Sequence, residues 1–195
     1  MAKPTKKKKR FFDVDMPIIG KETQLMGYEL KDLDGRFIQY DLTRVLRGKS
    51  MLIKLKVSVE GDKATAVPKE VKLMPYFLKR MMRKGTNYVE DSFSTKCKDA
   101  QIRIKPFLIT RRKVSRAVRK ALREKAKEEL ISYVKDKPAT ELFDDIIKNK
   151  IQKPLSLKLK KVYPLSLCEI RIFKVEKELK EKKEEKPKKD SDKKE

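Results

Sequence analysis

The sequence predicts an α+β domain in which strands come first and helices come late, with a strongly charged segment at each end. Alternating apolar and polar residues mark most of the strands, and apolar residues three or four apart mark the helices. Residues 1–12 form a basic arm, and residues 13–176 form a single domain. Residues 177–195 form a Lys/Glu-rich tail, which is expected to be disordered because it has too little apolar surface to bury.

The first strands are separated by two turns. Thr23–Leu30 and Arg36–Leu42 are strand-like, and the Asp34-Gly35 dipeptide between them predicts a hairpin. Ser50–Val59 alternates in its second half, with Ile53, Leu55, Val57 and Val59 on one face and Lys54, Lys56 and Ser58 on the other. After a turn at Glu60–Lys63, Ala64–Val67 is expected to return as the partner strand.

The middle of the chain predicts a short helix and two more strands. Met74–Lys84 is the helix, with Pro75 in its first turn and Gly85 at its C-terminal cap. Thr86–Ser94 and Ala100–Ile109 are the strands, and Pro106 predicts an edge or bulge position in the second.

The longest predicted helix runs from about Arg111 to Lys135, with Thr110 as its N-cap. At 100° per residue its buried face would contain Val114, Ala117, Val118, Ala121 and Leu122. A second helix is expected after Pro138, capped by Thr140. Residues 155–162 fit either a strand or a short helix, and residues 167–175 alternate as a final strand.

The charge of the chain points to a polyanionic partner. The formal net charge is +24, from 53 Lys and Arg against 29 Asp and Glu, and such an excess opposes compaction unless an anion neutralises it. Nucleic acid is the favoured partner, because no apolar run approaches the roughly 20 residues that a membrane-spanning helix needs. The N-terminus has no apolar segment typical of a secretory signal, so an intracellular protein is expected.

Catalytic chemistry has little support in this sequence. The chain has no histidine, which excludes Ser-His-Asp and Cys-His arrangements and histidine-containing zinc sites, and it has no glycine-rich phosphate loop. Cys97 and Cys168 are interpreted as small apolar residues on strands, and the paired carboxylates as solvated or salt-bridged. We therefore expect no enzyme activity, cofactor, metal site or small-molecule substrate.

Basic residues gather in four places that are candidates for RNA binding. Arg112, Arg116, Arg119 and Arg123 would form a stripe of guanidinium groups along one face of the long helix, opposite its apolar face. The other candidates are Lys6, Lys7, Lys8, Lys9 and Arg10 in the arm; Lys79, Arg80, Arg83 and Lys84; and Arg103, Lys105, Arg111, Arg112 and Lys113. The arm also fits a nuclear-localisation signal or a segment that only aids solubility, and Tyr76, Phe77 and Tyr88 fit core packing better than base stacking. Basic clusters in several places predict a surface that RNA contacts on several sides.

Several segments resemble the archaeal and eukaryotic small-subunit ribosomal protein family S-one-e, also called S-three-a. They occur in the family's order: Gly35-Arg36-Phe37 before Tyr40-Asp41-Leu42, Met81-Met82-Arg83-Lys84, Phe107-Leu108-Ile109-Thr110, Val162-Tyr163-Pro164-Leu165 and Arg171-Ile172-Phe173-Lys174-Val175. The resemblance is to the archaeal type. It implies an α+β fold around a barrel-like antiparallel sheet.

The resemblance also implies a function. It predicts a structural constituent of the small ribosomal subunit in the cytoplasm, which binds rRNA on the platform near the mRNA exit and contacts neighbouring small-subunit proteins. The alternative is a non-ribosomal translation factor or RNA chaperone; membrane association is less favoured still. The resemblance assigns no base-specific contact and no role to the Lys/Glu-rich tail.

Overall fold

The computed structural model describes residues 8–179. Its strands are β1 (Arg10–Met16), β2 (Lys21–Gly27), β3 (Phe37–Asp41), β4 (Met51–Glu60), β5 (Lys63–Leu73), β6 (Tyr88–Glu90), β7 (Phe93–Lys96), β8 (Ala100–Thr110) and β9 (Leu165–Glu178). Its helices are α1 (Pro75–Met81), α2 (Arg116–Lys135), α3 (Ala139–Ile147) and α4 (Gln152–Lys160), with a 3₁₀ turn at Leu30–Leu33. The predicted α+β class is confirmed.

The strands join into one mixed sheet that does not close into a barrel. The order β2-β1-β5-β9-β8-β6 forms its main path, β3 and β4 extend from β5, and β7 pairs with β8. All pairings are antiparallel except that of β1 with β5, which rests on Asp15 opposite Thr65. The open sheet differs in this respect from the barrel that the resemblance implies.

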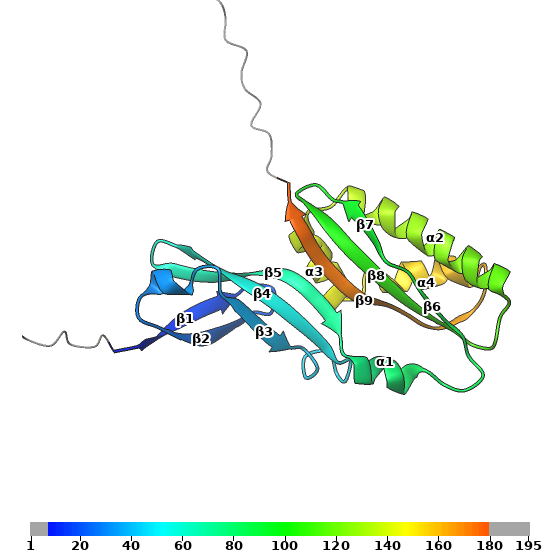
Figure 1. The fold of residues 1–195 in the computed structure, drawn as a ribbon, viewed down its shortest axis with the longest axis horizontal. Helices are drawn as coiled ribbons and strands as arrows, with labels where there is room; N and C mark the ends of the chain where they lie inside the picture. Colours follow the sequence, from blue (N-terminus) through cyan, green and yellow to red (C-terminus); the bar gives the residue numbers. More distant parts are fainter. Residues whose placement is uncertain (1–7, 180–195) are drawn as a thin grey trace, which may run out of the picture.

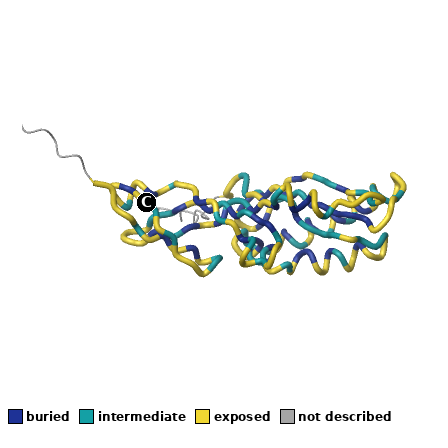
Figure 2. Tube along the Cα trace, turned by 90° about the horizontal axis from the view of Figure 1, so that it is seen from below, coloured by how far each residue is buried: buried dark blue, intermediate teal, exposed yellow. Residues whose placement is uncertain are grey.

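The sheet divides into two halves along an elongated molecule (Figures 1 and 2). The N-terminal half, residues 8–73, contains β1–β5, and the C-terminal half, residues 86–179, contains β6–β9 with α2–α4. The halves meet where β5 pairs with β9 at three positions, from Glu70 opposite Lys174 to Lys72 opposite Ile172. α1 connects them along the chain.

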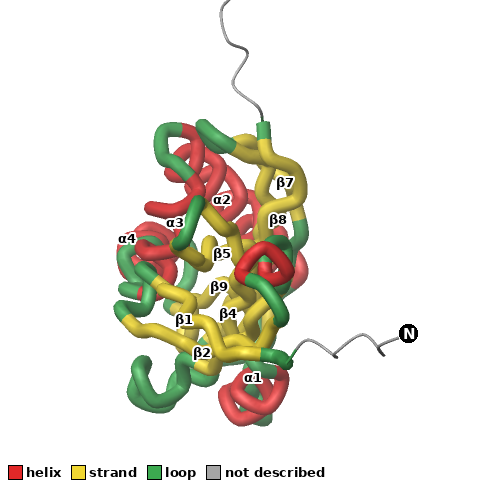
Figure 3. Tube along the Cα trace, turned by 90° about the vertical axis from the view of Figure 1, so that its left-hand side faces the viewer, coloured by secondary structure: helices red, strands yellow, loops and turns green. Residues whose placement is uncertain are grey.

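Helices cover one face of the C-terminal half. Phe173 of β9 meets Phe143 of α3 edge to face, with ring centroids 4.9 Å apart, and both side chains are fully buried. α1 lies on the opposite side of the strands from α2 and α3 (Figure 3). β8 is therefore buried on both faces near its end, at Phe107, Leu108 and Ile109, whereas Arg103 nearer its start is exposed.

Several predictions from the N-terminal half are confirmed, but the hairpin at Asp34-Gly35 is wrong. Gly35 does adopt a positive φ of 74°, as a turn there requires. However, β2 pairs with β1, and β3 pairs with β4. The predicted hairpin of β4 with its returning partner is confirmed, and β5 extends well beyond Val67.

The boundaries of the ends and of the middle segments also differ. β1 begins at Arg10, inside the predicted arm, and β9 continues to Glu178, because each pairs with a neighbouring strand.

The elements in the middle of the chain differ in their bounds. α1 ends at Met81, so Gly85 lies beyond its cap, although Pro75 does occupy the first turn. Thr86–Ser94 forms two short strands, β6 and β7. Pro106 lies at a register shift in β8, which confirms a bulge. α4 shows that residues 155–162 are mainly helical.

Candidate nucleic-acid interface

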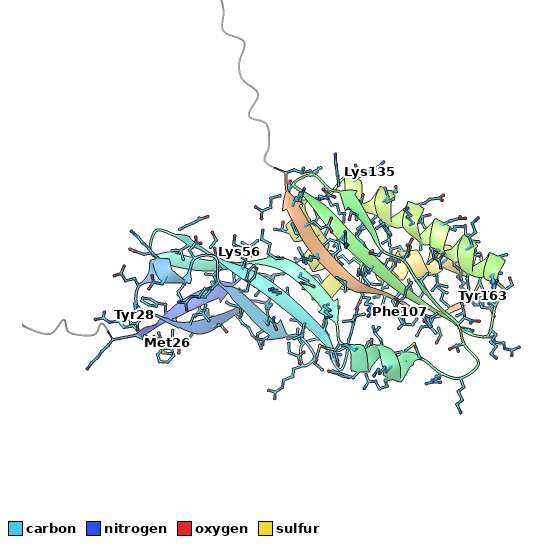
Figure 4. The ribbon with its side chains drawn as sticks, viewed as in Figure 1. Met26, Tyr28, Lys56, Phe107, Lys135 and Tyr163 are labelled. Carbon is cyan, nitrogen blue, oxygen red and sulfur yellow. The ribbon has the colours of Figure 1, made fainter. Side chains whose placement is uncertain are left out.

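Residues 71–89, 100–123 and 146–168 are three of the longer stretches of the chain that contain no aspartate or glutamate. Each contains several lysines or arginines, and the fold brings part of each to the same end of the molecule. The backbone N–H of Thr110 donates to the carbonyl of Asn87 at 2.9 Å, and that of Arg111 donates to the carbonyl of Pro164 at 3.4 Å. Tyr163 lies at this end, near the start of α2, whereas Lys135 lies at the other end of that helix (Figure 4).

Six exposed cations form what we call the basic end: Arg83, Lys84, Arg111, Arg112, Lys113 and Arg116. Within residues 8–179, none of these side chains forms an ion pair. Cations that lack carboxylate partners remain available for phosphate oxygens. The structure thus joins two clusters that the sequence presents separately, one after α1 and one before α2.

Asn87 and Thr110 hold the backbone of the basic end in place. The amide oxygen of Asn87 accepts from the backbone N–H of Val114 at 2.8 Å. The fully buried Thr110 hydroxyl accepts from the N–H of Asn87 at 3.1 Å and lies 2.7 Å from the carbonyl of Arg112. The segment that contains Arg111–Lys113 is therefore anchored at both ends, although it belongs to no helix or strand.

Thr110 is consequently not the helix cap that the sequence predicts. α2 begins at Arg116, where the hydroxyl of Ser115 accepts from the N–H of Val118 at 3.4 Å. The predicted start is five residues too early because Thr110 bonds within the β6–β8 region instead. Thr140 likewise lies inside α3, whose N-cap is Pro138.

The faces of α2 also differ from the prediction. The buried residues recur every four positions at Leu122, Ala126, Leu130 and Val134. Ala117 and Ala121 are exposed and Val118 is half-buried, because the larger apolar side chains of the second half of the helix set which face packs. Alanine carries little apolar surface, so its exposure costs little.

The predicted arginine stripe is accordingly shorter. Arg112 precedes the helix, and Arg119 is half-buried, with its Nε atom buried and unpartnered within the described chain. Arg116 and Arg123 remain exposed, two turns apart on the helix. The sequence placed four arginines on one face, and the structure leaves two of them fully accessible there.

The cluster on α1 is partly engaged in local contacts. Arg80 donates to the carbonyl of Gly48 at 3.3 Å, and its guanidinium lies 5.5 Å from the ring centroid of Phe77. Lys79 is exposed beside it. Phe77 is buried, as predicted, whereas Tyr76 and Tyr88 are 51% and 56% exposed, so the core-packing interpretation is wrong for these two tyrosines.

Two predicted groups lie away from the basic end. Arg103 forms an ion pair with Glu176 at 2.6 Å, and it lies eight residues before Arg111, roughly 25 Å along an extended strand. Lys8, Lys9 and Arg10 are exposed at the opposite end of the molecule, where β1 begins (Figure 1). Lys6 and Lys7 lie outside the described residues.

Basic residues also line the open face of the sheet, and most of them were not predicted. Lys54, Glu70, Lys174 and Arg103 stand opposite one another in a row across β4, β5, β9 and β8. Lys72 and Lys105 belong to the adjacent row, and Lys56 of the same face is labelled in Figure 4. The alternation of Lys54 and Lys56 with buried residues is the sequence signal that could have identified this face. Lys160 and Lys161, at the end of α4, are further exposed cations that the prediction missed.

The two cysteines have no chemistry that serves this interface. Cys97 lies in the turn before β8 rather than on a strand, and its thiol donates to the carbonyl of Ala100. Cys168 is on β9, and burial first, then the charge of Glu169, raises the pKa of its thiol to about 12. Within residues 8–179 there is no group of side chains suited to hold a metal ion, and none of the helices there is long and apolar enough to cross a membrane.

Comparison with known proteins identifies the family. The Ribosomal S3Ae family matches residues 2–179. The Small ribosomal subunit protein eS1 of Nanoarchaeum equitans is 26% identical over 179 residues, which cover 87% of this chain and 90% of that protein. The protein of that name from Methanobrevibacter smithii is 24% identical over 87% of this chain and 92% of its own length. The one from Pyrobaculum arsenaticum is 26% identical over 70% of this chain and 63% of its own length. This chain therefore belongs to the ribosomal S3Ae family.

Proposed function

We propose that the protein is a structural constituent of the small ribosomal subunit that binds rRNA through its basic end. The observation that carries this proposal is the meeting of three carboxylate-free stretches at one end of the fold. The six exposed cations of the basic end, which come from the first two of these stretches, have no ion-pair partner within residues 8–179. Uncompensated cations on an anchored backbone suit the regularly spaced phosphates of an RNA helix.

The open face of the sheet supplies a second surface for the same partner. Lys54, Lys72, Lys105 and Lys174 project from neighbouring strands, interleaved with Glu70. A rigid sheet fixes the spacing of the Cα atoms that carry these charges, so little backbone freedom is lost on binding. RNA that binds both surfaces would contact the protein on more than one side. Such contacts suit a ribosomal protein better than a protein that binds a single groove of a nucleic acid.

The family resemblance supports a finer proposal for the location. We place the protein in the cytoplasm, on the platform of the small subunit near the mRNA exit, where it supports subunit assembly and translation. Neighbouring small-subunit proteins are its second class of partner. Exposed apolar side chains of the N-terminal half, among them Phe11, Met26 and Phe37, suit contacts of that kind. The proposed role includes no catalytic step, cofactor or small-molecule substrate.

The test is to follow the tagged protein through sucrose-gradient sedimentation of a cell extract at moderate salt. A structural constituent should remain with the small subunit, and a photo-crosslinker at Lys113 should attach to small-subunit rRNA. Release of the protein into the light fractions, with crosslinks to other RNA, would instead identify a translation factor or an RNA chaperone.

The salt dependence of binding gives an independent test. Each phosphate neutralised contributes roughly 0.7–0.9 to the slope of log K against log salt. For the cognate rRNA fragment we expect a slope of magnitude above about 5, because the six cations of the basic end contribute roughly 4–5 and the lysines of the open sheet face add to it. A slope near 1 would show that most of these charges face solvent in the complex.

A further inference from the structure

A cleft lies between α1 and the edge of the C-terminal sheet, next to the basic end. Its volume is about 280 Å³, close to the lower end of small-molecule sites, roughly 300–1,000 Å³. Leu78, Lys79 and Met82 line it from the side of α1, and Tyr88, Glu90 and Arg171 line it from the sheet. The cleft combines an apolar wall, an aromatic ring and a charged pair, and the proposed phosphate contacts use none of these three features.

The aromatic ring is Tyr88, which is held in place from behind. It stacks on the buried ring of Phe107, with centroids 6.1 Å apart and the ring planes inclined by 23°. Tyr88 nevertheless remains 56% exposed. A fixed aromatic ring with this much exposed surface is a platform on which a flat ligand can stack.

The charged pair gives the cleft a polar edge. Nη1 of Arg171 lies 2.8 Å and 3.0 Å from the two carboxylate oxygens of Glu90. Both side chains are more than a third exposed, so Arg171 retains free N–H donors and Glu90 retains free lone pairs. A ligand that satisfies them must present donors and acceptors side by side on one edge. A nucleobase does so, whereas the carboxylate of Glu90 disfavours a bare phosphate and an aliphatic side chain would leave the pair without partners.

The surroundings of the cleft fit the backbone that carries a base. Lys79 stands at its rim, and Arg83 and Lys84 follow α1 toward the basic end. We propose that this cleft binds one unstacked nucleobase of RNA, with the ring on Tyr88, the base edge on Glu90 and Arg171, and the adjoining phosphate near Lys79. This inference rests on the proposed function for the identity of the partner as RNA.

The test compares two single-stranded RNA probes of equal length and charge, an oligoadenylate and an abasic ribose-phosphate oligomer, bound to the full-length protein. Stacking on one aromatic ring strengthens binding by about tenfold, so the parent should prefer oligoadenylate by about that factor. Tyr88→Ala and Tyr88→Leu should both lose most of the preference, and Tyr88→Phe should keep it. The leucine variant retains apolar contact with Phe107, so the result does not depend on whether the alanine variant folds.

Tyr76→Ala is the matched control. Tyr76 is 51% exposed on α1 but does not line the cleft, so its loss should leave the preference for oligoadenylate unchanged. If Tyr76→Ala and Tyr88→Leu behave alike, or if the parent binds both probes equally, the cleft is not a nucleobase site.

Salt titrations separate this inference from the proposed function. Stacking releases no counterions, so Tyr88 variants should bind oligoadenylate with an unchanged salt slope, whereas Arg111→Glu with Lys113→Glu should lower the slope. RNA binding that responds to the arginine and lysine changes but not to Tyr88 overturns the cleft alone. Absence of any measurable RNA binding by the parent overturns both.

Discussion

The two halves of the molecule differ in which charged and apolar side chains they expose. β1 and β2 of the N-terminal half place exposed acids near cations, as at Asp13, Asp15 and Glu22, and this half exposes large apolar side chains such as Phe11 and Phe37. At the far end of the C-terminal half, cations stand without acids. The excess of positive charge is therefore unevenly distributed: the C-terminal half carries more of it than the N-terminal half.

The carboxylates of the C-terminal half are largely engaged in ion pairs with other cations. Glu169 pairs with Lys49 at 2.6 Å, Asp145 pairs with Lys137 at 2.6 Å, and Glu90 pairs with Arg171 at 2.8 Å. These carboxylates lie beside cations other than those of the basic end, so they do not neutralise the basic end. The carboxylates of this half are thus paired elsewhere, and the cations of the basic end are left without carboxylate partners.

The largest expected effect concerns the core beneath the basic end. Leu122→Asp buries a charge without a partner at a fully buried position, and it should lower the free energy of unfolding by more than about 4 kcal/mol. Ala121→Asp, one residue earlier on the exposed face of α2, should lower it by less than about 1 kcal/mol. Thermal unfolding followed by circular dichroism distinguishes them. Equal losses would mean that α2 packs through the face that the sequence predicts.

The next effect concerns the ion pairs of the C-terminal half. Asp145 is buried and accepts from Lys137 at 2.6 Å and from Tyr133 at 2.8 Å. Asp145→Asn should lower the free energy of unfolding by about 2–3 kcal/mol, because a charged hydrogen bond is lost in a partly dry site. Asp144→Asn is the control, since its pair with Lys148 is exposed and contributes less than about 0.5 kcal/mol. Urea unfolding measures both, and a similar loss for the two variants would contradict the assigned role.

The same pair predicts a pH dependence. Burial by itself would raise the pKa of Asp145, but the hydrogen bonds from Lys137 and Tyr133 outweigh it and hold the pKa below its ordinary value. The stability that Asp145 contributes is therefore present above the unfolded pKa, about 3.9, and is lost as the pH falls through the folded pKa. The hydrogen bonds to Asp145 and Tyr133 raise the pKa of Lys137, so its contribution is present at neutral pH and disappears only in strong alkali. Below about pH 4 the parent should lose stability more steeply than Asp145→Asn.

A smaller change, in the free energy of rRNA binding, is expected when charges of the C-terminal half are reversed, and it tests the difference in charge between the two halves. Arg116→Glu with Arg123→Glu should weaken rRNA binding by more than about tenfold while the melting temperature stays within a few degrees. Lys31→Glu with Lys63→Glu makes the same change in net charge on exposed residues of the N-terminal half and should alter binding much less. If both pairs weaken binding equally, net charge alone attracts the RNA and the basic end has no special role.

The smallest effect concerns the anchor of the basic end. Asn87→Ala removes the acceptor for the backbone N–H of Val114 and should cost about 1 kcal/mol of stability. The amide hydrogen of Val114 should exchange faster, and rRNA binding should weaken by a few fold, since a freed segment must be ordered again on binding. Unchanged exchange at Val114 would show that other contacts hold this segment.

The sequence predicts local structure well where one periodicity dominates, as in β4, whose alternation at Ile53, Lys54 and Leu55 is the observed burial pattern. It misplaces elements whose boundaries depend on distant partners. Thr110 has the chemistry of a helix cap, but the pairing of Asn87 with Thr110 occupies it. Asp34-Gly35 does form a turn, but the strands on either side of it pair with other strands, β2 with β1 and β3 with β4, because packing of the whole sheet determines the pairing.

The sequence indicates most residues of the candidate site, but it does not indicate that they lie together in the fold. Arg83, Lys84 and Arg111–Lys113 are visible in the sequence as basic runs, yet nothing local indicates that they lie together. That depends on the antiparallel pairing of β6 with β8, with Tyr88 opposite Ile109. Arg103 shows the converse, since it is near Arg111 in sequence but pairs with Glu176 far from the basic end.

The position of β9 in the sheet has a consequence for the order in which the chain folds during synthesis. β1–β5 are contiguous in sequence and can assemble their own core once residue 73 has emerged, because their contacts are comparatively local. The C-terminal half must wait for β9, the last strand, which pairs with β8 along almost its whole length and with β5 at the junction. During synthesis, the cationic segments around α1 and α2 therefore leave the ribosomal exit tunnel well before β9, the strand that completes the sheet of this half. During that interval these cationic segments belong to a half whose sheet is still incomplete.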